Sequence, residues 1–166
     1  MCAASEYGGP VREAILALKR GERAYLRPLA ALLAPLVAPG TAIVPAPTTR
    51  RRSAERGFDQ SCALARRVAE LSSGWVDDVL CKHGGPQRGL GRDGRLAARG
   101  RFRVRPGADV PSAAILLDDV VTTGATLLDA ATVLADAGCR VLGAVVVART
   151  LPGRETSARA DRLVEA

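Results

Sequence analysis

Apolar residues keep a helical spacing in some stretches of the chain and form short continuous runs in others, which predicts an α/β fold. From residue 10 to residue 37 they recur at helical spacing, with Gly21 as a break, so we expect two helices there. The run 41–45 is apolar and is bounded by Pro and Gly residues, which indicates a short buried strand.

The middle of the chain is less regular. A charged stretch, 50–56, precedes a predicted helix with an apolar face formed by Leu64, Val68 and Leu71. Residues 76–82 and 102–104 are predicted strands. Between them, residues 83–100 are rich in Gly and Arg and have no apolar period, so they cannot bury a face of their own. We expect a flexible Gly/Arg-rich loop there, either a lid over a site or a segment disordered without ligand.

The clearest unit lies near the carboxyl end. The runs 114–117 and 141–148 are continuously apolar, which is typical of strands buried on both faces, and the helical pattern 126–137 between them ends at Gly138. Two such strands joined by a helix predict a parallel sheet. We therefore expect one α/β domain over residues 1–150, a parallel sheet flanked by helices, and a short tail over 151–166.

The formal charge of +7 is carried mainly by arginine, because Lys19 and Lys82 are the only lysines among 24 basic residues. Two interpretations stay open. The arginines could reflect a compositional bias and lie solvated on the surface. Alternatively they could bind a polyanion, since guanidinium groups bind phosphate in bidentate fashion. Nucleic acid, nucleotides and sugar phosphates are all compatible with the second interpretation.

The four cysteines are far apart in the sequence and form no Cys-x-x-Cys pair, which argues against a zinc site or a disulfide framework. The first ten residues lack the basic and apolar regions of a signal peptide. The longest apolar run, 29–38, is about half a membrane span and contains Pro35. We expect a cytoplasmic protein that does not enter a membrane.

A candidate phosphate site follows the predicted strand 114–117. Asp118 and Asp119 stand at the carboxyl end of that strand, where ligands bind in open α/β sheets. The segment 122–126, Thr-Thr-Gly-Ala-Thr, then opens a helix whose unpaired N–H groups and positive dipole end favour a phosphate. Ribose hydroxyls or Mg²⁺ would separate the two acids from that phosphate. The alternative is an acidic helix start capped by threonines, where nothing binds.

The whole string 114–126 is similar to the phosphoribosyl pyrophosphate signature of type I phosphoribosyltransferases. Two further blocks resemble the ComF family, phosphoribosyltransferase-like proteins associated with competence for DNA uptake. The first is Arg56-Gly57-Phe58-Asp59-Gln60, and the second is Gln87, Leu90 and Arg95 followed by Gly100-Arg101-Phe102. The resemblance extends from about Tyr7 to Thr150, with Asp59 and Ala98 where the family commonly has Asn and Arg101 where a small residue is common.

This resemblance implies an enzyme that binds phosphoribosyl pyrophosphate with Mg²⁺ and transfers phosphoribosyl to an unidentified base or amine. Asp118 and Asp119 would be the catalytic residues and would hold the ribose hydroxyls, directly or through Mg²⁺. The expected ligand-binding residues are Val121, Thr122, Thr123, Gly124, Ala125, Thr126, Pro47, Arg52, Arg56, Gln60 and Arg95. Arg52, Arg56 and Arg95 would balance charge on pyrophosphate, although Arg56 could instead pair with an acid near its helix.

A second function stays open. The same resemblance fits a non-enzymatic accessory protein of competence that senses a sugar phosphate or engages competence proteins or single-stranded DNA. The charge and the cluster 50–56 favour this alternative, whereas the scarcity of aromatic stacking residues opposes direct DNA binding. Family members commonly carry an amino-terminal zinc ribbon, but we expect no metal-binding cysteines in this chain. A homodimer is a further possible assembly.

Overall fold

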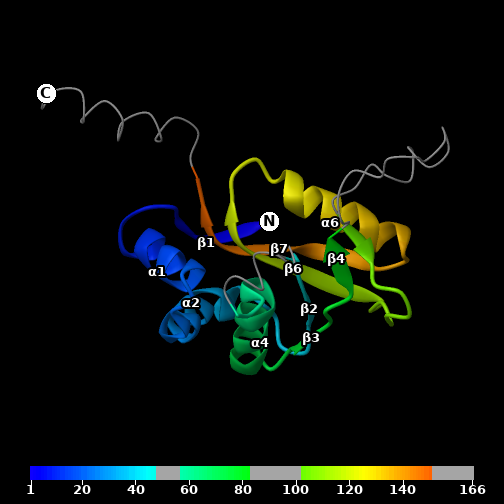
Figure 1. The fold of residues 1–166 in the computed structure, drawn as a ribbon. Helices are drawn as coiled ribbons and strands as arrows, with labels where there is room; N and C mark the ends of the chain where they lie inside the picture. The colour runs from blue at the N-terminus through cyan, green and yellow to red at the C-terminus, as the bar shows by residue number, and fades with distance from the viewer. Residues whose placement is uncertain (48–56, 83–101, 151–166) are drawn as a thin grey trace, which may run out of the picture.

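A computed structural model describes residues 1–47, 57–82 and 102–150. Its main sheet has five strands, all parallel, in the order β1-β7-β6-β2-β3 (Figure 1). The strands are β1 (Cys2–Glu6), β2 (Ala42–Pro45), β3 (Trp75–Val76), β6 (Ala113–Val121) and β7 (Arg140–Arg149). The predicted segments 83–100 and 151–166 lie outside the described residues.

Helices cover both faces of this sheet, which confirms the α/β prediction. The helices α1 (Gly9–Lys19), α2 (Leu26–Leu33) and α4 (Gln60–Ser72) pack on one face, and the short 3₁₀ turns η1 (Arg23–Tyr25) and η2 (Ala34–Leu36) flank α2. The other face carries α6 (Ala125–Asp136) and the antiparallel pair of β4 (Leu80–Lys82) and β5 (Phe102–Val104) (Figure 1). Among the helices of the described ranges, none has the length and apolarity to cross a bilayer.

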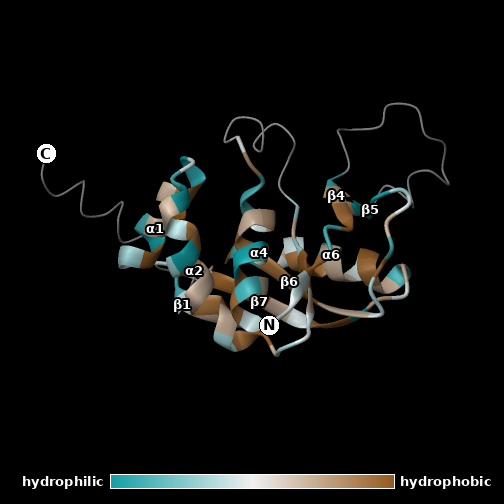
Figure 2. Ribbon diagram, turned by 90° about the horizontal axis from the view of Figure 1, so that it is seen from below, coloured by the Kyte–Doolittle hydropathy of each residue, from teal (hydrophilic) through white to brown (hydrophobic). Residues whose placement is uncertain are grey.

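Strand β6 shows why the central strands have continuous apolar runs. Ala114 and Leu116 pack with α6, whereas Leu117 packs with α1, α2 and α4, and all three side chains are almost completely buried. Because helices cover both faces of this part of the strand, its successive positions from Ala114 to Leu117 all carry apolar side chains. In Figure 2 the strands of the sheet are accordingly mainly brown, and hydrophilic residues appear on the covering helices.

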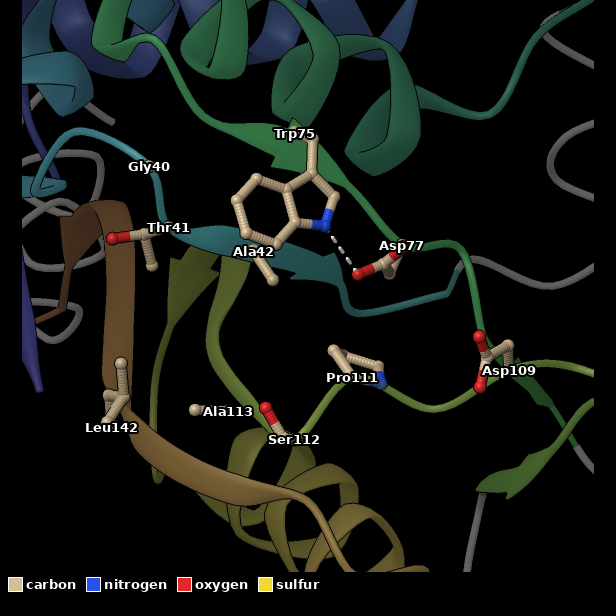
Figure 3. A pocket seen from close by; sticks show the side chains of 10 residues that line it. All are labelled: Gly40, Thr41, Ala42, Trp75, Asp77, Asp109, Pro111, Ser112, Ala113 and Leu142. Atoms are coloured by element: carbon tan, nitrogen blue, oxygen red, sulfur yellow. Dashed lines mark hydrogen bonds between the residues drawn. The ribbon is translucent and has the colours of Figure 1, made fainter.

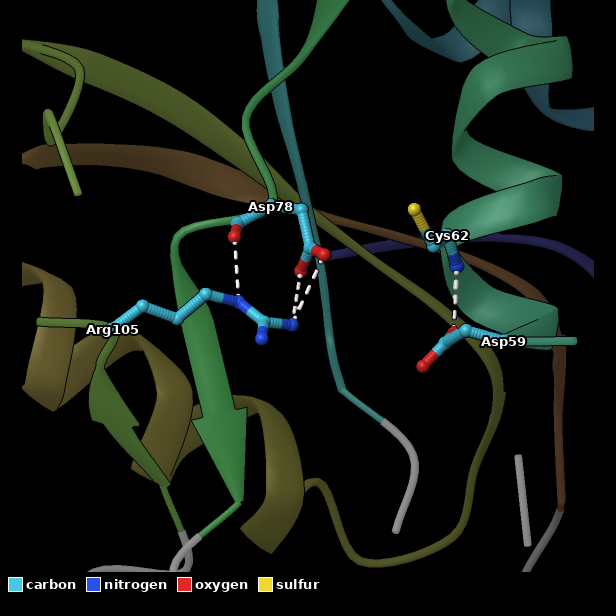
Figure 4. A network of polar contacts seen from close by, with 4 residues as sticks. All are labelled: Asp59, Cys62, Asp78 and Arg105. Carbon is cyan, nitrogen blue, oxygen red and sulfur yellow. Dashed lines mark hydrogen bonds and ion pairs between the residues drawn. The ribbon is translucent and has the colours of Figure 1, made fainter. Parts of the chain in front are cut away.

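The prediction of one strand over residues 76–82 is wrong, because β3 ends at Val76 and β4 begins at Leu80 in a different sheet. Arg105 holds the chain between them. Its Nε donates to the carbonyl of Asp78 over 2.8 Å, and its Nη2 donates to both carboxylate oxygens of Asp78 over 2.9 and 3.0 Å (Figure 4). Leu80–Lys82, which follow this contact, pair with β5 in the second sheet.

Two other differences have local causes. Strand β1 was not predicted, because it is a partly exposed strand of small and polar residues that, among the described strands, pairs with β7 alone. Leu71 does not belong to the buried face of α4, since its exposed fraction is 47%. Ala65 and Ala69 share that face with Leu64 and Val68 instead.

Candidate functional site

The strand order places a topological switch point at the carboxyl ends of β2 and β6. From β2 the chain proceeds through α4 to β3 on one side, and from β6 it proceeds through α6 to β7 on the other side. The two helices therefore pack on opposite faces of the sheet. Neighbouring parallel strands whose connections diverge in this way leave a crevice between them, and ligands bind there in open α/β folds.

Asp118 and Asp119 lie at this crevice, within β6 and not after it as expected. Pro45, the last residue of β2, is in register with Leu117, and Ala46 N–H donates to the Leu117 carbonyl over 2.8 Å. Strand β6 continues from there to Val121 beside β7 alone. The two carboxylates therefore begin where β2 ends.

Three groups engage the carboxylate of Asp119. Lys19 Nζ is 3.0 Å from Oδ2, Gln60 Nε2 donates to the same oxygen over 3.0 Å, and Val120 N–H donates to Oδ1 over 2.7 Å. Lys19 ends α1 and Gln60 begins α4, so two helices meet at this one acid. Gln60 is only 2% exposed, and its amide positions Asp119.

Asp118 is in a different electrostatic state. Burial, followed by the charge of neighbouring Asp119, raises the pKa of Asp118 to about 7. Two contacts act in the opposite direction: Asp119 N–H donates to Asp118 Oδ1 over 2.8 Å, and Lys19 contributes a positive charge. The acid pair is therefore incompletely ionised near neutral pH. Such a pair can both donate hydrogen bonds to and accept them from sugar hydroxyls.

The loop after β6 leaves the start of α6 open. Gly124 is the N-cap residue, with φ of 79° and ψ of −4°, a left-handed conformation that favours glycine. It contributes no capping side chain, and the first turn of α6 contains no acidic residue. Thr123 Oγ1 accepts from Ala125 N–H only over a long 3.4 Å, and Thr122, Thr123 and Ala125 are exposed. A helix start of this kind suits an anion.

The structure brings most of the predicted site residues to this edge. Val121 is buried at the end of β6, Thr122 to Thr126 form the partly exposed turn into α6, and Pro47 follows β2. Gln60 lies against Asp119. The three arginines expected at the pyrophosphate, Arg52, Arg56 and Arg95, lie outside the described residues.

The sequence analysis missed two roles. Lys19 was not identified as a site residue, because an ion pair between distant segments leaves no local pattern. The one feature of the sequence that could have drawn attention to Lys19 is its residue type, because the chain has two lysines among 24 basic residues. Asp59, where the ComF family commonly has Asn, is the N-cap residue of α4, and its Oδ1 accepts from Cys62 N–H over 3.0 Å (Figure 4).

The acid pair could supply part of the ligands of a Mg²⁺ ion. Mg²⁺ prefers carboxylate oxygens and is usually held by one or two carboxylates together with substrate phosphates and water. Asp118 and Asp119 supply two such groups, and within the described ranges no cluster of three or more His, Cys, Asp or Glu side chains could hold a metal. The residues therefore fit a Mg²⁺ ion that takes its other ligands from substrate and water.

A hollow lies at the opposite, amino-terminal ends of the strands (Figure 3). Its volume is about 510 Å³, and Trp75, Asp77, Asp109 and Leu142 are among the residues that line it. Trp75 is half exposed, and its indole Nε1 donates to Asp77 Oδ2 over 2.9 Å. Two carboxylates, with no Lys or Arg among the described lining residues, make this hollow unsuitable for a phosphate.

No protein-family model and no curated protein matches the sequence. Solved structures similar to it include the adenine phosphoribosyltransferase of Leishmania donovani, with a TM-score of 0.47 and 14% identity over 82% of this chain and 57% of that one. The Trypanosoma brucei enzyme, solved with AMP, pyrophosphate and ribose-5-phosphate, gives a TM-score of 0.45 and 15% identity over 76% of this chain and 64% of that one. The chain thus spans less than two thirds of both.

The adenine phosphoribosyltransferase of Thermoanaerobacter pseudethanolicus gives a TM-score of 0.43 and 11% identity, over 78% of this chain and 82% of that one. Because these TM-scores are below 0.5, the likeness alone assigns neither a ligand nor a reaction to this chain. The relation to the ComF family stays a prediction from the sequence.

Proposed function

We propose that this chain binds a phosphoribosyl ligand, phosphoribosyl pyrophosphate with Mg²⁺, in the crevice between β2 and β6. The observation that supports this most strongly is the start of α6, which has no capping side chain at Gly124 and follows directly on a strand that carries two carboxylates. A phosphate needs the open helix start, and ribose hydroxyls need the acids. A phosphoribosyl group carries both a phosphate and ribose hydroxyls.

Each part of the site has a task in this proposal. The turn from Thr122 to Thr126 holds the 5′-phosphate with its N–H and hydroxyl groups. Asp118 and Asp119 bind the ribose hydroxyls and would hold Mg²⁺, whose chemistry there is to neutralise charge on the pyrophosphate. Gln60 keeps Asp119 in place through the hydrogen bond to Oδ2. The protein would act mainly by positioning the substrate and stabilising charge, because the reaction would pass through an oxocarbenium-like state of the ribose.

Transfer of phosphoribosyl to a base or amine is the reaction that this site would support. The acceptor is not indicated by any described residue. The alternative of a competence accessory protein depends on the cluster 50–56, which lies outside the described residues, and it stays a prediction from the sequence. Pyrophosphate release, screened across nucleobases, separates an enzyme from a protein that only binds the ligand.

Isothermal titration with phosphoribosyl pyrophosphate, with and without Mg²⁺, tests the proposed site. We expect wild-type protein to bind and the double variant Asp119→Asn, Thr123→Ala to lose at least tenfold in affinity, since it removes one charge and one hydroxyl donor from the site. Arg67→Met is a suitable control, because Arg67 forms an exposed ion pair with Glu70 on α4. Unchanged binding by the double variant would exclude this site.

A further inference from the structure

Lys19 places a positive charge directly on the acid pair of the candidate site. Its Nζ lies 3.0 Å from Asp119 Oδ2, and the exposed fractions of the two side chains are 33% and 17%. The ion pair is therefore largely shielded from water on the side of Asp119 but open to solvent on the side of Lys19. A ligand bound beside Asp119 would meet this ammonium group.

The type of residue is informative. Of 24 basic residues only two are lysines, so lysine at position 19 departs from the strong preference of this chain for arginine. An ammonium group is a compact charge with three donors, whereas a guanidinium group is a planar fork that suits bidentate pairing with one carboxylate. With one contact made to Asp119 Oδ2, the ammonium of Lys19 retains capacity to donate to a second acceptor.

The charges of the site require such a group. Negative charge on the acid pair opposes the binding of a phosphate nearby, and a cation beside the acids reduces this repulsion. Lys19, the last residue of α1, is a cation that the protein itself supplies at Asp119.

We propose that Lys19 is a ligand-binding residue, a tethered cation that neutralises Asp119 and allows the site to bind a pentose phosphomonoester such as ribose 5-phosphate without a divalent metal. This inference rests on the proposed function, because it assumes that the phosphate binds at the start of α6. It adds Lys19 to the ligand-binding residues of that site, and it adds pentose phosphomonoesters bound without a metal to the ligands.

Titration of ribose 5-phosphate in the presence of EDTA tests the role of Lys19. We expect wild-type protein to bind and Lys19→Met to lose at least tenfold in affinity, with Lys19→Arg, which keeps the charge but not the compact ammonium group, losing less than Lys19→Met. Arg20→Met is the matched control, since it removes the same charge from the next residue, which pairs with Glu22 and not with the site. This control should bind within about twofold of wild type.

The outcomes separate this inference from the proposed function. If wild-type protein binds ribose 5-phosphate only with Mg²⁺, or if Lys19→Met binds as well as or better than wild type in EDTA, the role of Lys19 is wrong and the site stands. If wild-type protein binds ribose 5-phosphate neither with Mg²⁺ nor without it, the proposed function itself fails. Should Lys19→Met not fold, as judged by circular dichroism, Lys19→Gln gives the same decision.

Discussion

Helices α4 and α6 both follow strands that end at the same edge of the sheet, but they begin in opposite ways. The N-cap residue of α4 is Asp59, whose carboxylate accepts a hydrogen bond from Cys62 N–H. The N-cap residue of α6 is Gly124, which has no side chain to offer. The protein thus caps the start of α4 with its own carboxylate, whereas the N-cap residue of α6 supplies no anion, an arrangement that suits an anion from solution.

The strongest test of this difference is to give α6 the cap that α4 has. Gly124→Asp places a carboxylate at the start of α6, where we propose that the phosphate binds. Since like charges in contact repel strongly, we expect the affinity for ribose 5-phosphate to fall about 100-fold. Isothermal titration in the presence of Mg²⁺ measures the loss.

Gly124→Asn is the control for shape, because Asn and Asp have similar size and both tolerate a positive φ. We expect Gly124→Asn to lose much less affinity than Gly124→Asp. Equal losses in the two variants would show that the site depends on the space at Gly124 and not on charge.

The two helices also differ in the space around the glycine that follows each of them, and stability measurements on alanine variants can detect this difference. A Cβ on Gly74, after α4, would lie 2.6 Å from the backbone carbonyl oxygen of Thr41, whereas a Cβ on Gly138, after α6, would meet nothing within 4 Å. Gly74→Ala forces backbone apart, and we expect it to lower the free energy of unfolding by about 2 kcal/mol. In Gly138→Ala the cost comes from backbone strain alone, because φ is 87°, and we expect the free energy of unfolding to fall by about 1 kcal/mol.

Urea unfolding of the two alanine variants provides the comparison. The order of the two losses is the result that matters, because the clash and the strained φ have separate causes. A larger loss for Gly138→Ala would mean that the connection between α4 and β3 can move away from Thr41.

The unit around α6 could be predicted from the sequence better than the unit around α4, for a physical reason. Strands β6 and β7 are buried on both faces, so their apolar runs are long and unambiguous. Strand β3 has two residues, and its separation from β4 depends on the contact between Arg105 and Asp78, which are far apart in the sequence. A local pattern contains no information about such a contact.

The residues of the candidate site also differ in how far the sequence could predict them. The acids and the turn into α6 were predicted, because consecutive residues form them and their order alone suggests a phosphate. Lys19 was not predicted, since α1 brings it to Asp119 only through tertiary packing. Asp59 was noted as a departure from the ComF pattern, but its role as a helix cap follows from the position of α4.

Asp118, ahead of α6, should make folding stability depend on pH. Its pKa is raised from 3.8 to about 7, so between these values the folded state binds more protons than the unfolded state, and stability falls as pH rises. Asp118→Asn removes this dependence. Urea unfolding in EDTA at pH 5 and pH 8 should show that wild-type protein loses about 1.5 kcal/mol relative to the variant, less than the full shift implies because solvent reaches the site. Parallel changes in both proteins would contradict the raised pKa.

The smallest expected effect concerns the cap of α4. Asp59→Ala leaves Cys62 N–H without its acceptor and should lower the free energy of unfolding by about 1 kcal/mol, whereas Asp59→Asn keeps an acceptor and should lose less. Binding of ribose 5-phosphate should change by no more than about threefold, through slight displacement of neighbouring Gln60. If Asp59→Ala instead weakened binding as strongly as Gly124→Asp, the start of α4 would belong to the ligand site, and the two helix starts would not differ in function.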